Sequence, residues 1–286
     1  MAEAAPAPPP QDDLIARYRR DGFIVVPGLF SPNRREQVLA GIAETFRLRA
    51  ATLGLGPPAG EGHAAFSALL GGLFDRDIPA YVAAAKLTQS LVGVHQMGVS
   101  PELMGVVEAL GLGLPAISTR PVIHYMADRL KIPGGYQKTP PHQDWRSVQG
   151  SLDGITVWTP LFDVGLNDYP LEVVPGSHLE GLRDSTPDMP NYRVRPELYS
   201  EADFCPLQLK AGDAVVFSGF LLHRTGETGG ENVRVSLSFR FNNAAEPSFV
   251  QRGYPDRYIY RADPAIVTPD FPSAEDLGTV FPGAGR

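Results

Sequence analysis

The spacing of hydrophobic residues changes along the chain, from a helical period in the first part to short alternating runs in the second. Residues 14–18 carry apolar side chains at helical spacing, and the run 22–27 predicts a short strand. Ser31 and Pro32 are typical of a helix start, because a hydroxyl caps the free amides and proline fits the first helical position. The predicted buried stripe of that helix is Val38, Leu39, Ile42, Phe46 and Leu48.

Helical patterns continue to Gly111, with one segment of weak periodicity between them. That segment, 54–72, is rich in Gly, Ala and Pro, and we interpret it as a loop that covers a site. Helical spacing resumes over 78–92 and again from Ser100 to Gly111. The first residues, 1–11, are rich in Ala and Pro and are predicted to be a disordered lead.

From Ile117 onward the pattern is a series of short strands separated by turns. Strands this short and evenly spaced are typical of a sandwich or barrel. Because the sequence shows no internal repeat, the simplest organisation is one mainly β domain over 12–286, with an N-terminal helical region packed against it. The predicted strands are Pro121–Met126, Lys138–Trp145, Gly154–Phe162, Leu171–Val174, Ala214–Phe217, Leu221–Arg224 and Val233–Phe241.

The last predicted strand has one polar and one apolar face. Its polar face carries two arginines and two serines, and its other face is entirely hydrophobic. Taken alone, this alternation favours a surface strand with its polar face in water. The opposite assignment places the polar face in a ligand-filled barrel and the apolar face under the helices. We favour the second assignment because of the candidate metal ligands described below.

The composition narrows the class of protein. The 286 residues are 43% hydrophobic and 20% charged, which is ordinary for a folded globular chain. A net charge of −7 without a long Lys/Arg run disfavours a nucleic-acid partner. The single Cys205 excludes an intramolecular disulfide and a thiolate zinc cluster. Met1–Asp13 lacks a basic-then-apolar leader, and no run is long enough to span a bilayer, so we expect a cytoplasmic protein with no membrane partner.

The strongest chemical signal is His142-Gln143-Asp144, followed far down the chain by His223. On a strand, side chains at i and i+2 point to the same face, so His142 and Asp144 would lie side by side. Two imidazoles and one carboxylate leave coordination positions open and are typical of non-heme Fe(II) oxygenases. Arg234 and Ser236 follow, and arginine offers a planar cationic fork for a carboxylate-bearing cosubstrate.

Each of these residues also has a plainer interpretation. A His-x-Asp triplet often arises by chance on protein surfaces, and a lone histidine such as His223 is more often a packed core or surface residue. His178 is a rival ligand that we interpret as a turn residue, and His124 is interpreted as a packed histidine. What favours His223 is its place between the strand that begins at Gly212-Asp213 and Arg234.

Taken together, these stretches resemble the phytanoyl-CoA dioxygenase-like family of Fe(II)/2-oxoglutarate-dependent oxygenases. The resemblance covers roughly Tyr18 to Phe241 and implies a double-stranded β-helix, or jelly roll, with helices packed on one side. The segments that carry it, in the family's order, are Asp21–Gly28, His142-Gln143-Asp144, Trp158, Leu171–His178, the strand beginning at Gly212, His223 and Arg234.

The resemblance also implies a set of cofactors and the residues that hold them. His142, Asp144 and His223 would bind Fe(II), and no catalytic residue beyond these ligands is expected. Arg234 would pair with the far carboxylate of 2-oxoglutarate, with Ser236 and Trp158 as further contacts. The implied reaction consumes 2-oxoglutarate and O2, releases succinate and CO2, and hydroxylates or otherwise oxidises a C–H bond of the substrate.

Two departures from the family pattern bear on this interpretation. The family often has Asn-Gly before the Leu171–His178 segment, whereas this chain has Asn167-Asp168-Tyr169-Pro170, so we expect that turn to differ. Iron halogenases that resemble the family replace the ligand carboxylate by a small residue. Because Asp144 is present, halogenation is disfavoured.

The substrate is less well defined by the sequence. Trp145, Arg146 and Gln149 directly follow the first metal ligands, and Arg240 shares the polar face of Arg234, so all four are predicted substrate contacts. The segment 249–260 mixes arginines with tyrosines, which suits a sugar, carboxylate or phosphate. Packing on the barrel, or a contact between copies in a homo-oligomer, explains it at least as well. We favour a small polar or anionic substrate over a long acyl thioester, because no basic cluster suits coenzyme A.

Two other classes of protein stay open from the sequence. A metal-dependent cupin isomerase or lyase would use a similar barrel but would not need Arg234 to hold a diacid. A non-catalytic ligand-binding jelly roll would keep the fold without a metal.

Overall fold

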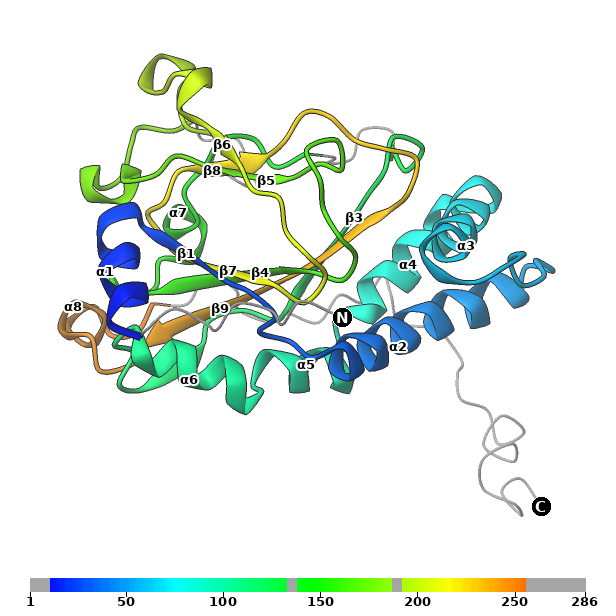
Figure 1. Ribbon diagram of the computed structural model, residues 1–286, viewed down its shortest axis with the longest axis horizontal. Helices are drawn as coiled ribbons and strands as arrows, with labels where there is room; N and C mark the ends of the chain where they lie inside the picture. Colours follow the sequence, from blue (N-terminus) through cyan, green and yellow to red (C-terminus); the bar gives the residue numbers. More distant parts are fainter. Residues whose placement is uncertain (1–10, 133–137, 187–191, 256–286) are drawn as a thin grey trace, which may run out of the picture.

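Two antiparallel sheets face each other, and helices from the first part of the chain cover the outer face of the larger sheet (Figure 1). The computed structural model describes residues 11–132, 138–186 and 192–255. The α-helices are α1 Gln11–Asp21, α2 Pro32–Ala51, α3 Gly62–Arg76, α4 Ile78–Thr88, α5 Val92–Gly98, α6 Pro101–Ala109, α7 Trp145–Val148 and α8 Pro247–Gln251, and short 3-10 turns cover Ser177–Glu180, Pro196–Leu198 and Glu201–Asp203.

The strands pair as a jelly roll, the fold predicted from the sequence. The larger sheet has the order β1-β7-β4-β9-β2, and β3 pairs with the first half of β9. The smaller sheet has the order β6-β5-β8. The strands are β1 Phe23–Val26, β2 Pro115–Ile117, β3 Val122–Met126, β4 Ile155–Pro160, β5 Leu171–Val173, β6 Cys205–Pro206, β7 Ala214–Ser218, β8 His223–Thr225 and β9 Arg234–Asn243.

Strand β9 turns its polar face toward the space between the sheets. The apolar residues of its other face are at most 3% exposed and pack with the helices in the main core; they are Val233, Val235, Leu237, Phe239 and Phe241. Arg234, Ser238 and Arg240 line an interior cavity. The surface-strand alternative is therefore wrong, because hydrophobic burial under the helices fixes which face of the strand points inward.

Helix α2 begins as predicted, with Ser31 accepting a hydrogen bond from the amide of Arg34 at 3.4 Å. Most of its predicted stripe is confirmed, since Val38, Ile42 and Phe46 are buried. The prediction that Leu48 is buried is wrong, because its side chain is 54% exposed. Leu48 is two residues after Phe46 and therefore lies on the opposite side of the helix, whereas the spacing of four residues continues the stripe at Ala50.

The helical region differs from the prediction in two further places. The predicted loop 54–72 is wrong from Gly62 onward, because α3 begins there and buries Phe66, Leu69, Leu70, Leu73 and Phe74 at helical spacing. The helix predicted over 78–92 ends earlier, at Thr88 of α4, and the second helix, α5, begins at Val92 and was not predicted. Between them the backbone of Leu91 is extended (φ −61°, ψ 133°).

The turn before β5 places a tyrosine where the backbone favours glycine. Tyr169 has a φ of 51°, the left-handed conformation that costs a non-glycine residue free energy. Its side chain is only 4% exposed, and its hydroxyl donates a hydrogen bond to Asp128. The Lys138 ammonium lies 5.3 Å from the centre of its ring. These contacts offset the backbone strain that an Asn-Gly sequence would avoid.

Some predictions fall on parts of the chain that are not described. The predicted disordered lead lies outside the described residues except for Gln11, which begins α1. In the segment 249–260, residues up to 255 are described, and α8 buries Phe249. Among the described residues, no helix has the length and hydrophobicity needed to cross a membrane.

The packing of β9 under the helices predicts a large difference between two leucine truncations. We expect Leu237→Ala to lower the free energy of unfolding by about 2–5 kcal/mol, because Leu237 is 0% exposed and its loss leaves a cavity. Leu48→Ala should change it by no more than about 0.5 kcal/mol. Urea denaturation followed by circular dichroism measures both. Equal effects of the two substitutions on the free energy of unfolding would contradict the assignment of Leu237 to the core and of Leu48 to the surface.

Candidate metal centre and cosubstrate cavity

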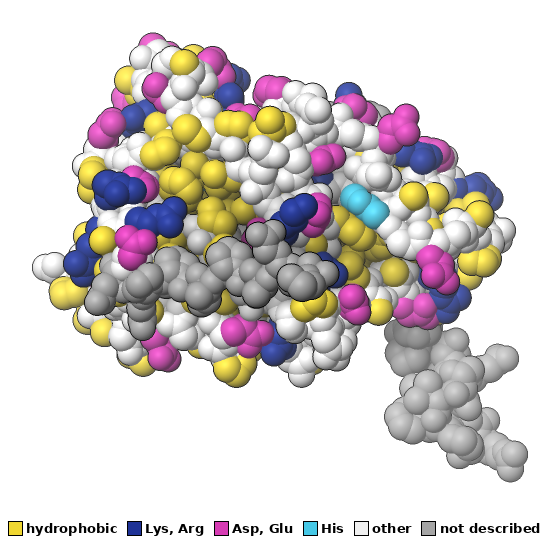
Figure 2. All heavy atoms as spheres, viewed as in Figure 1, with side chains coloured by type: hydrophobic (Ala, Val, Ile, Leu, Met, Phe, Trp, Pro, Cys, Tyr) yellow, Lys and Arg dark blue, Asp and Glu magenta, His cyan; other side chains and the backbone are white. Residues whose placement is uncertain are grey.

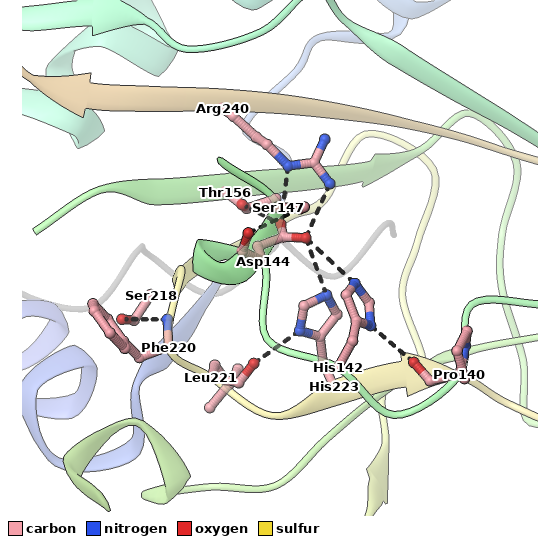
Figure 3. A network of polar contacts seen from close by, with 10 residues as sticks. All are labelled: Pro140, His142, Asp144, Ser147, Thr156, Ser218, Phe220, Leu221, His223 and Arg240. Atoms are coloured by element: carbon pink, nitrogen blue, oxygen red, sulfur yellow. Dashed lines mark hydrogen bonds and ion pairs between the residues drawn. The ribbon is translucent and has the colours of Figure 1, made fainter. Parts of the chain in front are cut away.

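His142, Asp144 and His223 meet at one point inside the jelly roll (Figure 3). One potential ligand atom from each lies within 4.8 Å of the others. The Oδ1 atom of Asp144 is 3.3 Å from Nε2 of His142 and 4.0 Å from Nε2 of His223. All three residues are at most 5% exposed. The structure thus brings together the three residues that the sequence selected, with their donor atoms facing a common point.

The backbone reaches this geometry by a route that the sequence analysis did not predict. The amide of His142 donates to the carbonyl of His223 at 3.0 Å, and that of His223 donates back at 3.1 Å. Asp144 leaves this pairing, since its φ of −57° and ψ of −34° are helical. The predicted strand Lys138–Trp145 is therefore wrong: only His142 pairs, in an isolated bridge, and Trp145 begins α7. The side chains of His142 and Asp144 converge because the backbone turns at Asp144 into helix α7.

Each imidazole is oriented by its second nitrogen. The Nδ1 atom of His142 lies 2.8 Å from the carbonyl oxygen of Pro140, and Nδ1 of His223 lies 2.9 Å from that of Leu221. These contacts leave both Nε2 atoms free to face the common point. Burial lowers the pKa of His223 to about 3, so its imidazole is neutral at physiological pH. A neutral imidazole is the form that binds a metal.

Asp144 is held from the side opposite the imidazoles. The hydroxyl of Thr156 donates to its Oδ2 at 2.7 Å, and Nε of Arg240 donates to the same oxygen at 3.0 Å. Burial by itself raises the pKa of the Asp144 carboxyl, but the charge of Arg240 and the two neighbouring histidines hold that pKa well below its ordinary value. The group is therefore an anion, ready to bind a cation.

Arg234 is a buried cation whose guanidinium is not matched by an acid. It is 4% exposed, its Nε has no hydrogen-bond partner, and none of the described carboxylates forms an ion pair with it. Its Cζ lies 5.4 Å from the ring centre of Trp158, and Nη2 contacts the sulfur of Met126. Burial lowers its pKa to about 9, which leaves it charged at neutral pH. A buried unpaired charge is costly, and an anionic ligand would satisfy it.

The metal cluster and Arg234 line one cavity of about 840 Å³ between the two sheets. Trp158 and Arg240, predicted from the sequence as a cosubstrate contact and a substrate contact, also line it. On the face drawn in Figure 2, hydrophobic side chains gather in hollows among Lys and Arg side chains. The remaining lining residues are Ser90, Ile117, Ser118, Thr119, Arg120, Val122, His124, Thr139, Ser147, Thr156, Leu171, Phe217, Arg224, Thr225 and Ser238.

Three predicted substrate residues lie away from this wall. Helix α7 carries Trp145 against Phe220, at 5.5 Å between ring centres. Arg146 donates to the carbonyl of Arg183, and Gln149 donates to that of Arg146. These three residues follow the metal ligands in sequence, but their side chains do not line the cavity. Trp145 packs against an aromatic ring, and Arg146 and Gln149 bind backbone carbonyls instead.

Ser236 and His124 lie opposite each other in the β3–β9 pairing. Ser236 is fully buried, and its hydroxyl has no partner among the described residues. His124, interpreted above as a packed histidine, faces the cavity directly opposite Ser236 in the β3–β9 pairing. Burial lowers its pKa to about 3, with Arg234 and Arg240 adding to the shift. Its position could have been predicted from the pairing register, because residues opposite each other share a face.

A jelly roll with two histidines and one carboxylate at an interior cavity is the arrangement of non-heme iron enzymes. A model of the phytanoyl-CoA dioxygenase family matches residues 18–236, well over half of the chain. The chain belongs to this family, as its sequence predicted.

Curated relatives and solved structures agree with this assignment. "Phytanoyl-CoA dioxygenase 1" of Oryza sativa subsp. japonica is 28% identical over 150 residues, which are 49% of this chain and 53% of the relative. The Arabidopsis thaliana "Phytanoyl-CoA dioxygenase" is 27% identical over 155 residues, again 49% and 53% of the two chains. The chain thus matches only about half the length of these curated relatives.

The solved structures support the fold. The epimerase SnoN, in complex with Fe3+, alpha ketoglutarate and nogalamycin RO, has a TM-score of 0.57 at 21% identity over 89% of this chain and 92% of its own. EctD from S. alaskensis, with 2-oxoglutarate and 5-hydroxyectoine, has a TM-score of 0.54 at 16% identity over 82% and 76%. At such identities the likeness confirms the jelly-roll fold.

Proposed function

We propose that the protein is an Fe(II)- and 2-oxoglutarate-dependent dioxygenase that oxidises a C–H bond of a small polar or anionic molecule and releases succinate and CO2. One observation carries the proposal: a cavity that contains a two-histidine, one-carboxylate cluster also contains a buried arginine with no acidic partner among the described residues. The cluster suits Fe(II), and the arginine suits the far carboxylate of a diacid that reaches the metal.

The donor set of the cluster fits iron. His142, Asp144 and His223 supply two neutral nitrogens and one anionic oxygen within 4.8 Å of one another, all on one side of the site. Three protein ligands on one face leave three positions of an octahedron for a chelating cosubstrate and O2. When bound, the iron would supply the oxidising chemistry, and the protein's tasks are to position the reactants and exclude water.

Arg234 would set the orientation of 2-oxoglutarate. Its planar guanidinium can form two parallel hydrogen bonds to a carboxylate, which a lysine ammonium cannot do with the same directionality. The ring of Trp158 lies under the guanidinium. Ser236, two residues further along β9, has a buried hydroxyl with no partner in the described part of the chain. Leu171 and Phe217 line the cavity as well and keep water from the reacting atoms.

The space beyond the cosubstrate supports a polar or anionic substrate. At roughly 30 Å³ for each non-hydrogen atom, the ten such atoms of 2-oxoglutarate fill about 300 Å³. More than half of the cavity of about 840 Å³ is then left for a substrate. Besides the residues named above, the cavity wall carries hydroxyl groups and a further arginine, from Ser90, Ser118, Thr119, Ser147 and Arg120. Such a wall suits a ligand with hydroxyl or acidic groups.

We expect the anaerobic protein with Fe(II) and 2-oxoglutarate to show a visible metal-to-ligand charge-transfer band, and to form succinate when O2 is admitted. Absorption spectroscopy and succinate analysis measure the two events. The matched control is 2-oxobutyrate, which can chelate the iron in the same way but lacks the far carboxylate, so it should bind much more weakly. Absence of both band and succinate would favour a cupin isomerase or lyase, or a non-catalytic ligand-binding jelly roll. Metabolites can then be screened for faster succinate release.

A further inference from the structure

We propose that Arg240 and Thr156 are positioning residues that fix the carboxylate of Asp144, so that only its Oδ1 is presented to the metal. This proposal rests on the proposed function, because it assigns Asp144 as a ligand. Neither residue is needed to explain the cluster itself, and both contact the carboxylate from outside it (Figure 3).

The contacts divide between the two oxygens of Asp144. Oδ1 faces the two imidazoles, at 3.3 Å and 4.0 Å from their Nε2 atoms. Oδ2 accepts the Thr156 hydroxyl at 2.7 Å and Nε of Arg240 at 3.0 Å. Nη2 of Arg240 also reaches Oδ1, at a longer 3.2 Å. With its lone pairs engaged by two donors, Oδ2 is poorly placed to turn toward an ion.

The two donors are fixed relative to each other by the sheet. Thr156 on β4 and Arg240 on β9 are direct partners in the antiparallel pairing, so their side chains leave the same face side by side. Thr156 is 2% exposed, and the side chain of Arg240 is 17% exposed. Asp144 lies on the short segment that enters α7 and is not itself part of a strand. The rigid sheet therefore orients a ligand that the local backbone leaves less constrained.

A single contact from Asp144 has a consequence for the chemistry. Three single-atom protein ligands leave three positions for a chelating cosubstrate and O2, whereas a carboxylate bound through both oxygens would occupy one of them. By engaging Oδ2, Arg240 and Thr156 keep that position open. This assigns Arg240 a role different from the substrate contact predicted from the sequence.

Because Arg240 is charged, a positioning role and a purely electrostatic role predict opposite changes in metal affinity when it is replaced. A guanidinium repels a divalent cation, so if it were only a nearby charge, its removal would strengthen metal binding. If Arg240 positions the ligand, its removal weakens metal binding, by about 10–100-fold for an outer partner of a ligand. Thr156 carries no charge and isolates the effect of orientation.

The test is the affinity for Mn(II) and Co(II) without 2-oxoglutarate, measured by titration calorimetry and, for Co(II), by its visible absorption. We expect Arg240→Gln and Thr156→Val to weaken binding about tenfold or more and to change the Co(II) spectrum, while Thr156→Ser retains the hydroxyl and the wild-type affinity. The matched control is Arg234→Gln, the other inward arginine of β9, which does not contact Asp144, so that loss of its charge should not weaken metal binding.

The outcomes separate this proposal from the function on which it rests. Unchanged or tighter metal binding in Arg240→Gln and Thr156→Val would overturn the positioning role, even if the wild type binds metal and 2-oxoglutarate. A wild-type protein that binds no metal would instead overturn the proposed function. If Arg240→Gln does not fold, as judged by circular dichroism, the Thr156→Val and Thr156→Ser pair decides the question.

Discussion

The Asp144→Ala variant is expected to lose iron-dependent turnover altogether. Asp144 supplies the only anionic donor of the cluster, 3.3 Å from one imidazole and 4.0 Å from the other. Losing an outer partner of a ligand already costs about 10–100-fold in metal affinity, so losing the ligand itself should cost at least about 100-fold. Succinate formation and Mn(II) titration measure the two effects. Retained full activity would remove Asp144 from the proposed ligand set.

A control is needed because the substitution also removes the acceptor of two hydrogen bonds from Arg240. Removing one partner of a buried ion pair costs stability. Asp144→Asn keeps the shape of the side chain and can still accept a hydrogen bond, but lacks the charge. We expect Asp144→Asn to unfold at a temperature closer to the wild type than Asp144→Ala does, and to remain strongly impaired in turnover. Thermal unfolding followed by circular dichroism therefore separates loss of the site from loss of the fold.

The identity of the site could be predicted from the sequence, but its local geometry could not. His142, Asp144 and His223 were selected because they occur in the family's order together with the strand from Gly212 and Arg234. The prediction used the alternation of a strand, whereas Asp144 has helical backbone angles. The angles depend on contacts such as the Trp145 amide donating to the Gly219 carbonyl, which lies far away in sequence. The residue types can be read directly from the sequence, whereas the backbone turn at Asp144 depends on a tertiary contact.

The same distinction explains the clearest error in the fold. Segment 54–72 was interpreted as a loop because its glycines and prolines lower helix propensity and its many small residues weaken the hydrophobic pattern. In the structure, five large apolar residues of α3 pack against the core and override that propensity. By contrast, β9 alternates strictly from Arg234 to Phe241, and its inward and outward faces were predicted correctly.

The substrate contacts were the weakest predictions for a related reason. Trp145, Arg146 and Gln149 were chosen because they follow the ligands in sequence, but α7 turns them away from the cavity. Arg120 and His124 do line the cavity, and they come from β3 and the loop before it. His124 faces the interior because β3 pairs with β9 in a register that places it opposite Ser236, and neighbours in sequence to the metal ligands carry no information on that register.

Replacing Arg234 by methionine should raise the KM for 2-oxoglutarate by about 30-fold or more. Truncating one partner of a buried charge pair costs about 2–5 kcal/mol, and each 1.4 kcal/mol is a factor of ten. Arg234→Lys keeps the charge but not the planar fork, so its KM should lie between those of the wild type and Arg234→Met. Initial rates of succinate formation at varied 2-oxoglutarate measure all three. An unchanged KM in Arg234→Met would place the far carboxylate elsewhere.

The same substitution should have the opposite effect on the stability of the ligand-free protein. The pKa of Arg234 is lowered to about 9, so the folded state holds this proton less tightly than the unfolded state, and the charge destabilises the fold at neutral pH. We therefore expect ligand-free Arg234→Met to unfold at a higher temperature than the wild type, with a gap that narrows as the pH rises above about 9. Adding metal and 2-oxoglutarate at 100 times its Kd should stabilise the wild type by about 2.7 kcal/mol and the variant much less. If the variant is less stable without 2-oxoglutarate and gains as much from it as the wild type, the guanidinium is a structural cation and not the binding group for the diacid.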